Sequence, residues 1–85
     1  MSAEVAQRVV AVFREVLAIE EESIDPNASI KGDLGADSLD QLSLFMALED
    51  EFGGTISEQE AAKLTTVGDV IGYISSRLEE SAVAQ

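Results

Sequence analysis

Apolar residues recur at the spacing of an α-helix in several segments of this chain, and no segment of useful length alternates like a β-strand. Residues three and four positions apart lie on the same face of a helix, so this spacing gives each helix one face to bury. A chain of 85 residues makes one domain with a small core. The sequence therefore predicts a single all-α domain over residues 1–85: a small four-helix bundle with three main helices, one short helix and a long first loop.

The first two long helices are predicted from their apolar spacing and from the residues at their ends. The first spans residues 3–18, with Ser2 as its expected cap. The second spans residues 38–52 and ends at Gly53-Gly54, because glycine readily takes the left-handed conformation that closes a helix. Ser38 stands at its start and is expected to cap it. The apolar face of the first helix comprises Val5, Val9, Val12, Phe13, Val16 and Leu17.

The C-terminal part of the chain predicts one short helix and one long helix. Ser57-x-x-Glu60 has the spacing of a capping box and predicts a short helix over residues 58–63. A last helix is expected from Val67 to about Glu80, followed by a loose tail over residues 81–85. Its apolar face comprises Val67, Val70, Ile71, Ile74 and Leu78, with Tyr73 at the edge.

Residues 19–37 are expected to form a long loop between the first two helices. The loop contains Pro26, the only proline of the chain. A loop of this length is uncommon in a small domain and is often functional. Ile24, Ile30 and Leu34 are its expected anchors in the core.

The helix over residues 38–52 has apolar residues on two opposite sides. At about 100° per residue, one side is expected to face the core, and the other lies opposite, close to Asp50. Either the long loop covers this second side, or the side is an exposed patch ringed by carboxylates, of the kind that binds protein partners. The core side comprises Leu44, Phe45, Leu48 and Phe52, and the second side comprises Leu39, Leu42 and Met46.

Acidic residues dominate the charge of the chain. Seventeen Asp and Glu against five Lys and Arg give a formal net charge of -12, which repels nucleic acids and anionic membranes. Such a surface either keeps a protein soluble or binds basic partners. The apolar runs are too short to span a membrane, the N-terminus has no signal-peptide pattern, and cysteine is absent, so a cytoplasmic monomer is expected.

Ser38 lies among acidic residues, with Asp37 before it and Asp40 after it, in a chain without histidine or cysteine. Nothing in the sequence is suited to activate its hydroxyl as a nucleophile. We therefore expect no catalytic residue and no enzymatic activity, and a hydrolase that uses Ser38 is disfavoured. No metal site is expected, because His and Cys ligands are missing. The serine is interpreted as a site that another enzyme modifies.

The segment Asp33-Leu34-Gly35-Ala36-Asp37-Ser38-Leu39-Asp40 resembles the attachment motif of acyl carrier proteins. The resemblance continues in register through residues 46–52, Ile56 and residues 63–67, and it covers nearly the whole chain. It implies a four-helix carrier domain in which Ser38 receives 4'-phosphopantetheine from coenzyme A. The thiol of this arm would hold acyl chains as thioesters, for fatty-acid biosynthesis or a related pathway.

The resemblance also implies partners and roles for the residues around Ser38. The partners would be a phosphopantetheinyl transferase and acyl-transfer, condensing and reducing enzymes with basic docking patches. The residues implied to contact these partners are Asp37, Leu39, Asp40, Leu42, Met46, Glu49 and Asp50, and those implied to line the interior that shelters the acyl chain are Leu44, Phe45, Leu48 and Phe52.

Three positions depart from the common pattern of the family. Ser43 stands in place of a glutamate, Phe45 in place of a valine and Ser57 in place of a proline. These departures suggest a polyketide or specialised lipid carrier as readily as a housekeeping carrier. An acidic protein-interaction module with an unmodified serine is the alternative from a different class.

Overall fold

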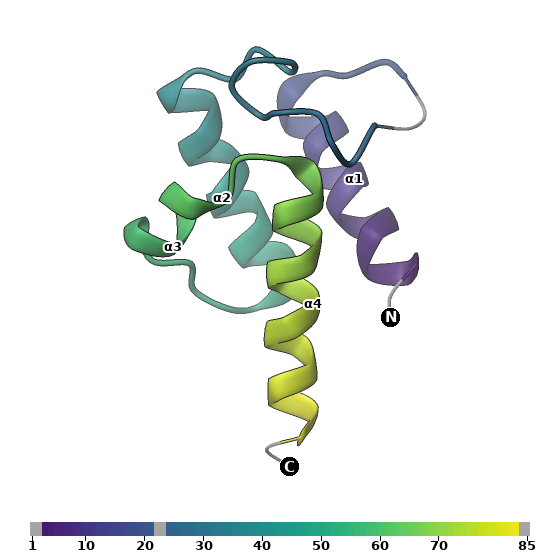
Figure 1. The fold of residues 1–85 in the computed structure, drawn as a ribbon, viewed down its shortest axis with the longest axis vertical. Coiled ribbons are helices and arrows are strands. Elements are labelled where there is room, and N and C mark those ends of the chain that lie inside the picture. Colours follow the sequence, from purple (N-terminus) through teal and green to yellow (C-terminus); the bar gives the residue numbers. More distant parts are fainter. Residues whose placement is uncertain (1–2, 22–23, 84–85) are drawn as a thin grey trace.

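The chain folds into helices that pack around one core (Figure 1). The computed structural model describes residues 3–21 and 24–83, with side chains over residues 4–21 and 24–78. In this described part the only β-type pairing is an isolated bridge, and no helix is long and apolar enough to cross a membrane. The predicted all-α architecture is confirmed. The helices are α1 (Ala3–Leu17), α2 (Ser38–Phe52), α3 (Glu58–Lys63) and α4 (Val67–Val83).

The predicted bounds of α2 and α3 are confirmed, whereas α1 and α4 end elsewhere than expected. α1 ends one residue early, at Leu17, because Ala18 takes the left-handed conformation that closes a helix (φ 55°). α4 passes the predicted end at Glu80 and runs to Val83, so a loose tail from residue 81 is wrong for the first three of its residues. No glycine or proline stops the helix there. The expected cap Ser2 and residues 84–85 lie outside the described residues.

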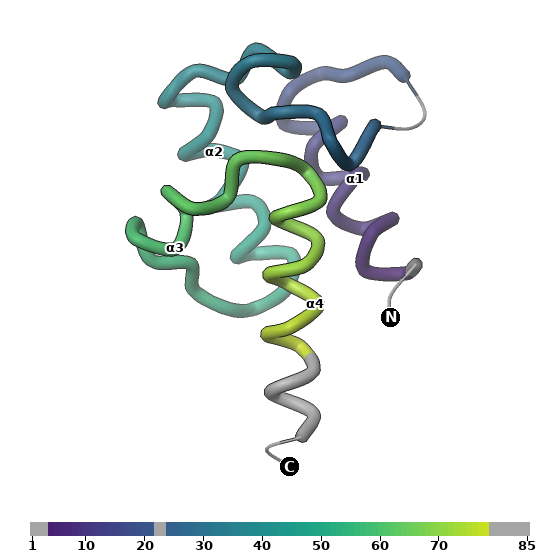
Figure 2. Tube along the Cα trace, in the orientation of Figure 1, coloured from purple at the N-terminus to yellow at the C-terminus, as the bar shows by residue number. Residues whose placement is uncertain are grey.

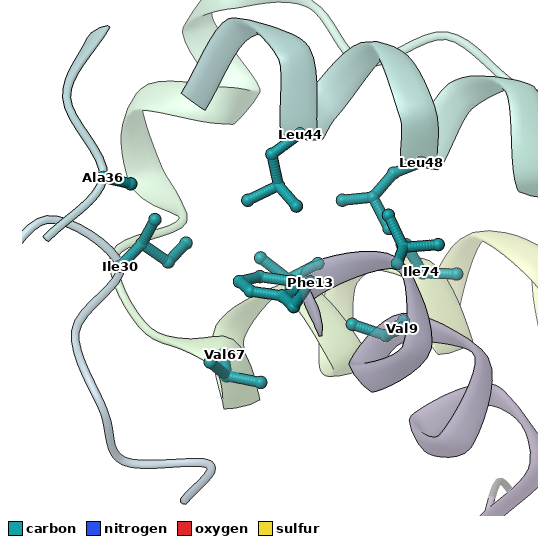
Figure 3. Packing of buried hydrophobic residues seen from close by; sticks show 10 residues of the cluster. Val9, Phe13, Ile30, Ala36, Leu44, Leu48, Val67 and Ile74 are labelled. Atoms are coloured by element: carbon teal, nitrogen blue, oxygen red, sulfur yellow. The ribbon is translucent and has the colours of Figure 1, made fainter. Parts of the chain in front are cut away.

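Phe13 of α1 stands at the centre of the core (Figure 3). Leu44 and Leu48 point toward it from α2, and Val67 lies beside it at the start of α4. α1 packs against both α2 and α4, so burial of its apolar face joins the two other long helices. The buried hydrophobic residues are Val9, Val12, Phe13, Ile30, Ala36, Leu44, Leu48, Val67, Val70 and Ile74.

The long loop between α1 and α2 arches over one end of the bundle and meets the start of α4 (Figure 2). Ile30 is buried and Ile24 and Leu34 pack partly buried against the core, which confirms the three predicted anchors. Backbone hydrogen bonds then tie the loop to the joint between α3 and α4: Ile30 N–H to Thr65 O at 2.9 Å, Val67 N–H to Ala28 O at 3.2 Å and Gly68 N–H to Pro26 O at 2.8 Å. The segment that leads into α2 is thereby held in one place.

Candidate functional site

Asp37 fixes the start of α2 as its N-cap. Its Oδ1 accepts a hydrogen bond from the Asp40 backbone N–H at 2.8 Å, and Asp40 Oδ2 accepts one from the Asp37 N–H at 3.3 Å. This capping box satisfies two backbone donors that a helix start otherwise leaves unpaired. The prediction that Ser38 caps α2 is therefore wrong. The cap lies one residue earlier, and Ser38 is the first residue of the helix.

The backbone before Ser38 turns into the core and out again. Gly35 has φ 71°, a left-handed conformation that glycine takes without strain, and Ala36 beside it is 2% exposed. The Ala36 N–H donates to Ile30 O at 3.0 Å, and Gln41 Nε2 donates to Ala36 O at 3.1 Å. The buried alanine thus anchors the segment immediately before the serine, while Ser38 itself is exposed.

The Ser38 hydroxyl does not help to hold the start of α2 in place. Asp37 performs the capping, and no hydrogen bond within the described part of the chain engages Ser38 Oγ. Since the sequence has no histidine, no imidazole is present to take its proton. An exposed serine in this setting is suited to be modified by an external enzyme.

The second apolar side of α2 is exposed next to this serine. Leu39, Leu42 and Met46 are 73%, 57% and 59% exposed, and we refer to these three residues as the exposed patch. Leu42 lies one helical turn beyond Ser38, and Met46 lies one turn further. The two-sided interpretation of α2 is confirmed, and the alternative that the long loop covers the second side is wrong. Serine and patch share one face of the helix.

The acidic residues at the end of α2 differ in what they contact. Asp50 is exposed, whereas Glu49 is half-buried and its Oε2 accepts a hydrogen bond from the Ile56 N–H at 2.7 Å. Glu51, which the sequence did not single out, pairs with Arg8 of α1 at 3.0 Å between Oε2 and Nε. Over the described residues no three His, Cys, Asp or Glu side chains gather as a metal site would require. Glu49 is thus engaged within the protein, and its predicted docking role remains a prediction.

A cavity of about 100 Å³ opens near the end of α2, away from Ser38. Of the four residues predicted to line an acyl-chain interior, Leu48 and Phe52 line this cavity and Leu44 and Phe45 do not, and their role toward an acyl chain stays a prediction. Leu44 is fully buried in the packed core, and Phe45 packs against that core partly buried. The sequence did not predict the other lining residues, which come from the end of α2, the α2–α3 loop and α4. They are Glu49, Gly53, Gly54, Thr55, Ile56, Tyr73, Ile74, Arg77 and Leu78.

Polar contacts at the starts of α3 and α4 shift three pKa values. The Tyr73 hydroxyl donates to Glu60 Oε1 at 2.7 Å and is the main cause of the lowered pKa of Glu60. Burial, followed by the hydrogen bond to Glu60, raises the pKa of Tyr73, while Arg77 donates to the same hydroxyl. The pKa of Asp69 is lowered, first by the Thr65 backbone N–H that donates to its carboxylate. Both carboxylates thus favour their charged form in the folded protein.

Comparison with known protein families matches residues 7–74 to the family described as "Phosphopantetheine attachment site". The match covers all of α2 and α3, most of α1 and the first part of α4. Proteins of this family carry 4'-phosphopantetheine as a covalent group. The start of α2 fits such a phosphoryl linkage, because Ser38 is exposed at a helix N-terminus, where backbone N–H groups and the helix dipole favour an anion.

Proposed function

We propose that this chain, which belongs to the phosphopantetheine attachment-site family, is an acyl carrier protein with Ser38 as the attachment residue. The observation that carries this assignment is the exposed Ser38 hydroxyl, which takes no part in capping α2. It stands at the start of a helix that Asp37 and Asp40 cap. When bound, 4'-phosphopantetheine supplies a thiol on which an acyl chain is held as a thioester. The chain itself presents the serine, and other enzymes carry out the chemistry.

The surface next to Ser38 supports recognition by basic, partly apolar partners. The exposed patch places three large apolar side chains on the face of α2 that Ser38 begins, and Asp50 adds an exposed carboxylate. A net charge of -12 speeds encounter with a positively charged enzyme surface, while the apolar contacts slow dissociation. We propose that a phosphopantetheinyl transferase and acyl-transfer, condensing and reducing enzymes dock on this face in turn.

Fatty-acid synthesis or a related pathway is the proposed setting, with a polyketide or specialised lipid pathway as the second candidate. Ser43 favours this second candidate, because it is an exposed, uncharged residue of α2 where the family commonly has a glutamate. A partner that requires a carboxylate at this position would bind the chain less tightly. Comparing the rates at which fatty-acid and polyketide condensing enzymes use the loaded protein, and its Ser43→Glu variant, separates the two.

The attachment itself is tested by intact-mass measurement after incubation with coenzyme A and a broad-specificity transferase. We expect the unmodified chain to gain the mass of one phosphopantetheine and Ser38→Ala to gain nothing. Ser43→Ala is the matched control, because Ser43 is a second exposed serine of the same helix, and this variant should load fully. Loading of Ser38→Ala would contradict the assignment, and failure of the unmodified chain to load would favour an unmodified interaction module.

A further inference from the structure

Glu49 contacts both ends of the turn that follows α2. Its backbone carbonyl accepts a hydrogen bond from the Gly53 N–H at 2.7 Å, which closes the helix. Its carboxylate Oε2 accepts a second one from the Ile56 N–H, also at 2.7 Å, although Ile56 lies seven residues further along the chain. A short hydrogen bond to a charged acceptor is among the stronger hydrogen bonds of a protein. Glu49 therefore joins the end of α2 to the end of this turn.

Few other hydrogen bonds hold this turn in place, although the Ile56 side chain packs partly buried against the core. Gly53, Gly54 and Thr55 are exposed, and among the described residues neither Gly54 nor Thr55 makes a hydrogen bond. α3, which follows, contains no buried residue. In the part of the chain that the structure describes, the hydrogen bond that the Glu49 carboxylate accepts is thus the one that ties residues 54–56 to α2, and without it these residues should open more often.

Residues 53–56 also form one wall of the cavity. The rest of the lining comes from α2 and α4, which contribute apolar side chains, among them Leu48, Ile74 and Leu78, and also the polar groups of Tyr73 and Arg77. A volume of about 100 Å³ is of the order of engineered apolar cavities that bind benzene. Glu49 lines the same cavity, so the residue whose carboxylate holds residues 53–56 is itself part of the cavity lining.

We propose that Glu49 is a positioning residue whose carboxylate fixes residues 53–56 as one side of this open cavity and thereby shapes it to bind an alkyl chain or small apolar molecule. The neighbouring acids do not share this role. Glu51 is paired with Arg8, and Asp50 is exposed. The proposal depends on the Glu49–Ile56 bond and the cavity alone, so it stands or falls separately from the modification of Ser38.

Three variants of the unmodified chain test this role through amide hydrogen exchange. Glu49→Ala removes the acceptor and should speed exchange of the Ile56 amide at least about tenfold. Glu49→Gln keeps an acceptor oxygen of similar reach and should restore most of the protection. Asp50→Ala is the matched control, because it removes an adjacent exposed carboxylate and should leave the Ile56 amide unchanged. The Val70 amide, in the core, reports any global loss of stability.

Benzene is the probe for binding in the cavity. Titration should shift the methyl signals of Ile56, Ile74 and Leu78, and benzene should bind Glu49→Ala several-fold more weakly than the parent and Glu49→Gln. The proposal is overturned if Ile56 exchange in Glu49→Ala matches that of the parent, or if it rises only in step with the Val70 amide. Failure of glutamine to restore protection, equal affinity for benzene in all variants, or absence of methyl shifts would overturn it as well.

Discussion

Truncating one leucine on each side of α2 should have opposite consequences. Leu48 is 1% exposed and packs in the core, whereas Leu42 is 57% exposed. Leu48→Ala removes buried methyl groups and enlarges a cavity that already exists beside it, which should cost about 2–5 kcal/mol. Leu42→Ala removes little buried surface, so its free energy of unfolding should stay within about 0.5 kcal/mol of the parent.

The loss expected for Leu48→Ala is large compared with the total stability of a chain of this size. At typical values per residue, 85 residues give a free energy of unfolding of about 4–13 kcal/mol. Leu48→Ala thus removes a substantial share of the total. Urea unfolding followed by circular dichroism measures both variants, and an unchanged denaturant slope shows that the midpoint shift reports stability alone.

A loading assay on a variant of the exposed patch completes the comparison. Leu42→Asp should remain folded, because the site is exposed, but it should be loaded more slowly by the transferase, since a charge replaces an apolar contact in the exposed patch. The reasoning is refuted if Leu42→Ala loses as much stability as Leu48→Ala, because both sides of α2 would then be core. It is also refuted if Leu42→Asp is folded and loaded at the parental rate, because the patch would then not serve recognition.

Three further predictions follow from particular contacts. The pKa values of Glu60 and Asp69 are lowered in the folded protein from ordinary values of 4.5 and 3.8, so the stability that these carboxylates add is present above those values and is lost as pH falls through the lower folded pKa values. In a stability–pH curve, the double variant Glu60→Gln, Asp69→Asn should therefore lose less stability at acid pH than the parent. An equal loss of stability in the two proteins would contradict this. Arg8→Ala should lower the free energy of unfolding, measured in urea, by about 0.5–1.5 kcal/mol. Arg8 donates a hydrogen bond to the Glu51 carbonyl and lies 4.4 Å from the Phe52 ring centroid, at the end of a helix whose last turn has no basic residue of its own. An unchanged free energy of unfolding would show that these contacts do not stabilise the fold. Gly72→Ala should stabilise α4 by about 0.5–1 kcal/mol, because alanine favours a helix more than glycine does and nothing lies within 4 Å of the added Cβ. Gly68→Ala should gain nothing or lose stability, because its Cβ would lie 3.0 Å from the Pro26 carbonyl oxygen of the long loop. Equal melting temperatures for the two variants would refute this close approach.

The sequence predicts the helices of this fold well because their signals are local. Apolar spacing, Gly53 after α2 and the Ser57-x-x-Glu60 box all act within one or two turns, and the observed bounds of α2 and α3 agree with them. The two sides of α2 are predictable for the same reason, since helix geometry alone separates Leu42 from Leu48. The sequence places the cap of α2 one residue too late, because Asp37 and Ser38 are both good capping residues.

The cavity and its surroundings depend on contacts between distant parts of the chain. Arg8 meets Glu51 across 43 positions, and the Tyr73 hydroxyl reaches Glu60 across 13. No periodicity within one segment indicates such pairs. Glu49 shows the same limit, because its acidic character suggested a surface role, whereas the path of the following turn places a backbone N–H against its carboxylate.

The central claim, that Ser38 is the attachment residue, is tested most directly by tandem mass spectrometry of the loaded chain. After transfer from coenzyme A and proteolysis, the peptide that contains Ser38 should carry one phosphopantetheine, and its fragments should place the group on Ser38. The peptides that contain only the other serines should be unmodified. A group placed on Ser43 or on any other residue, or a chain that accepts none, would contradict the account.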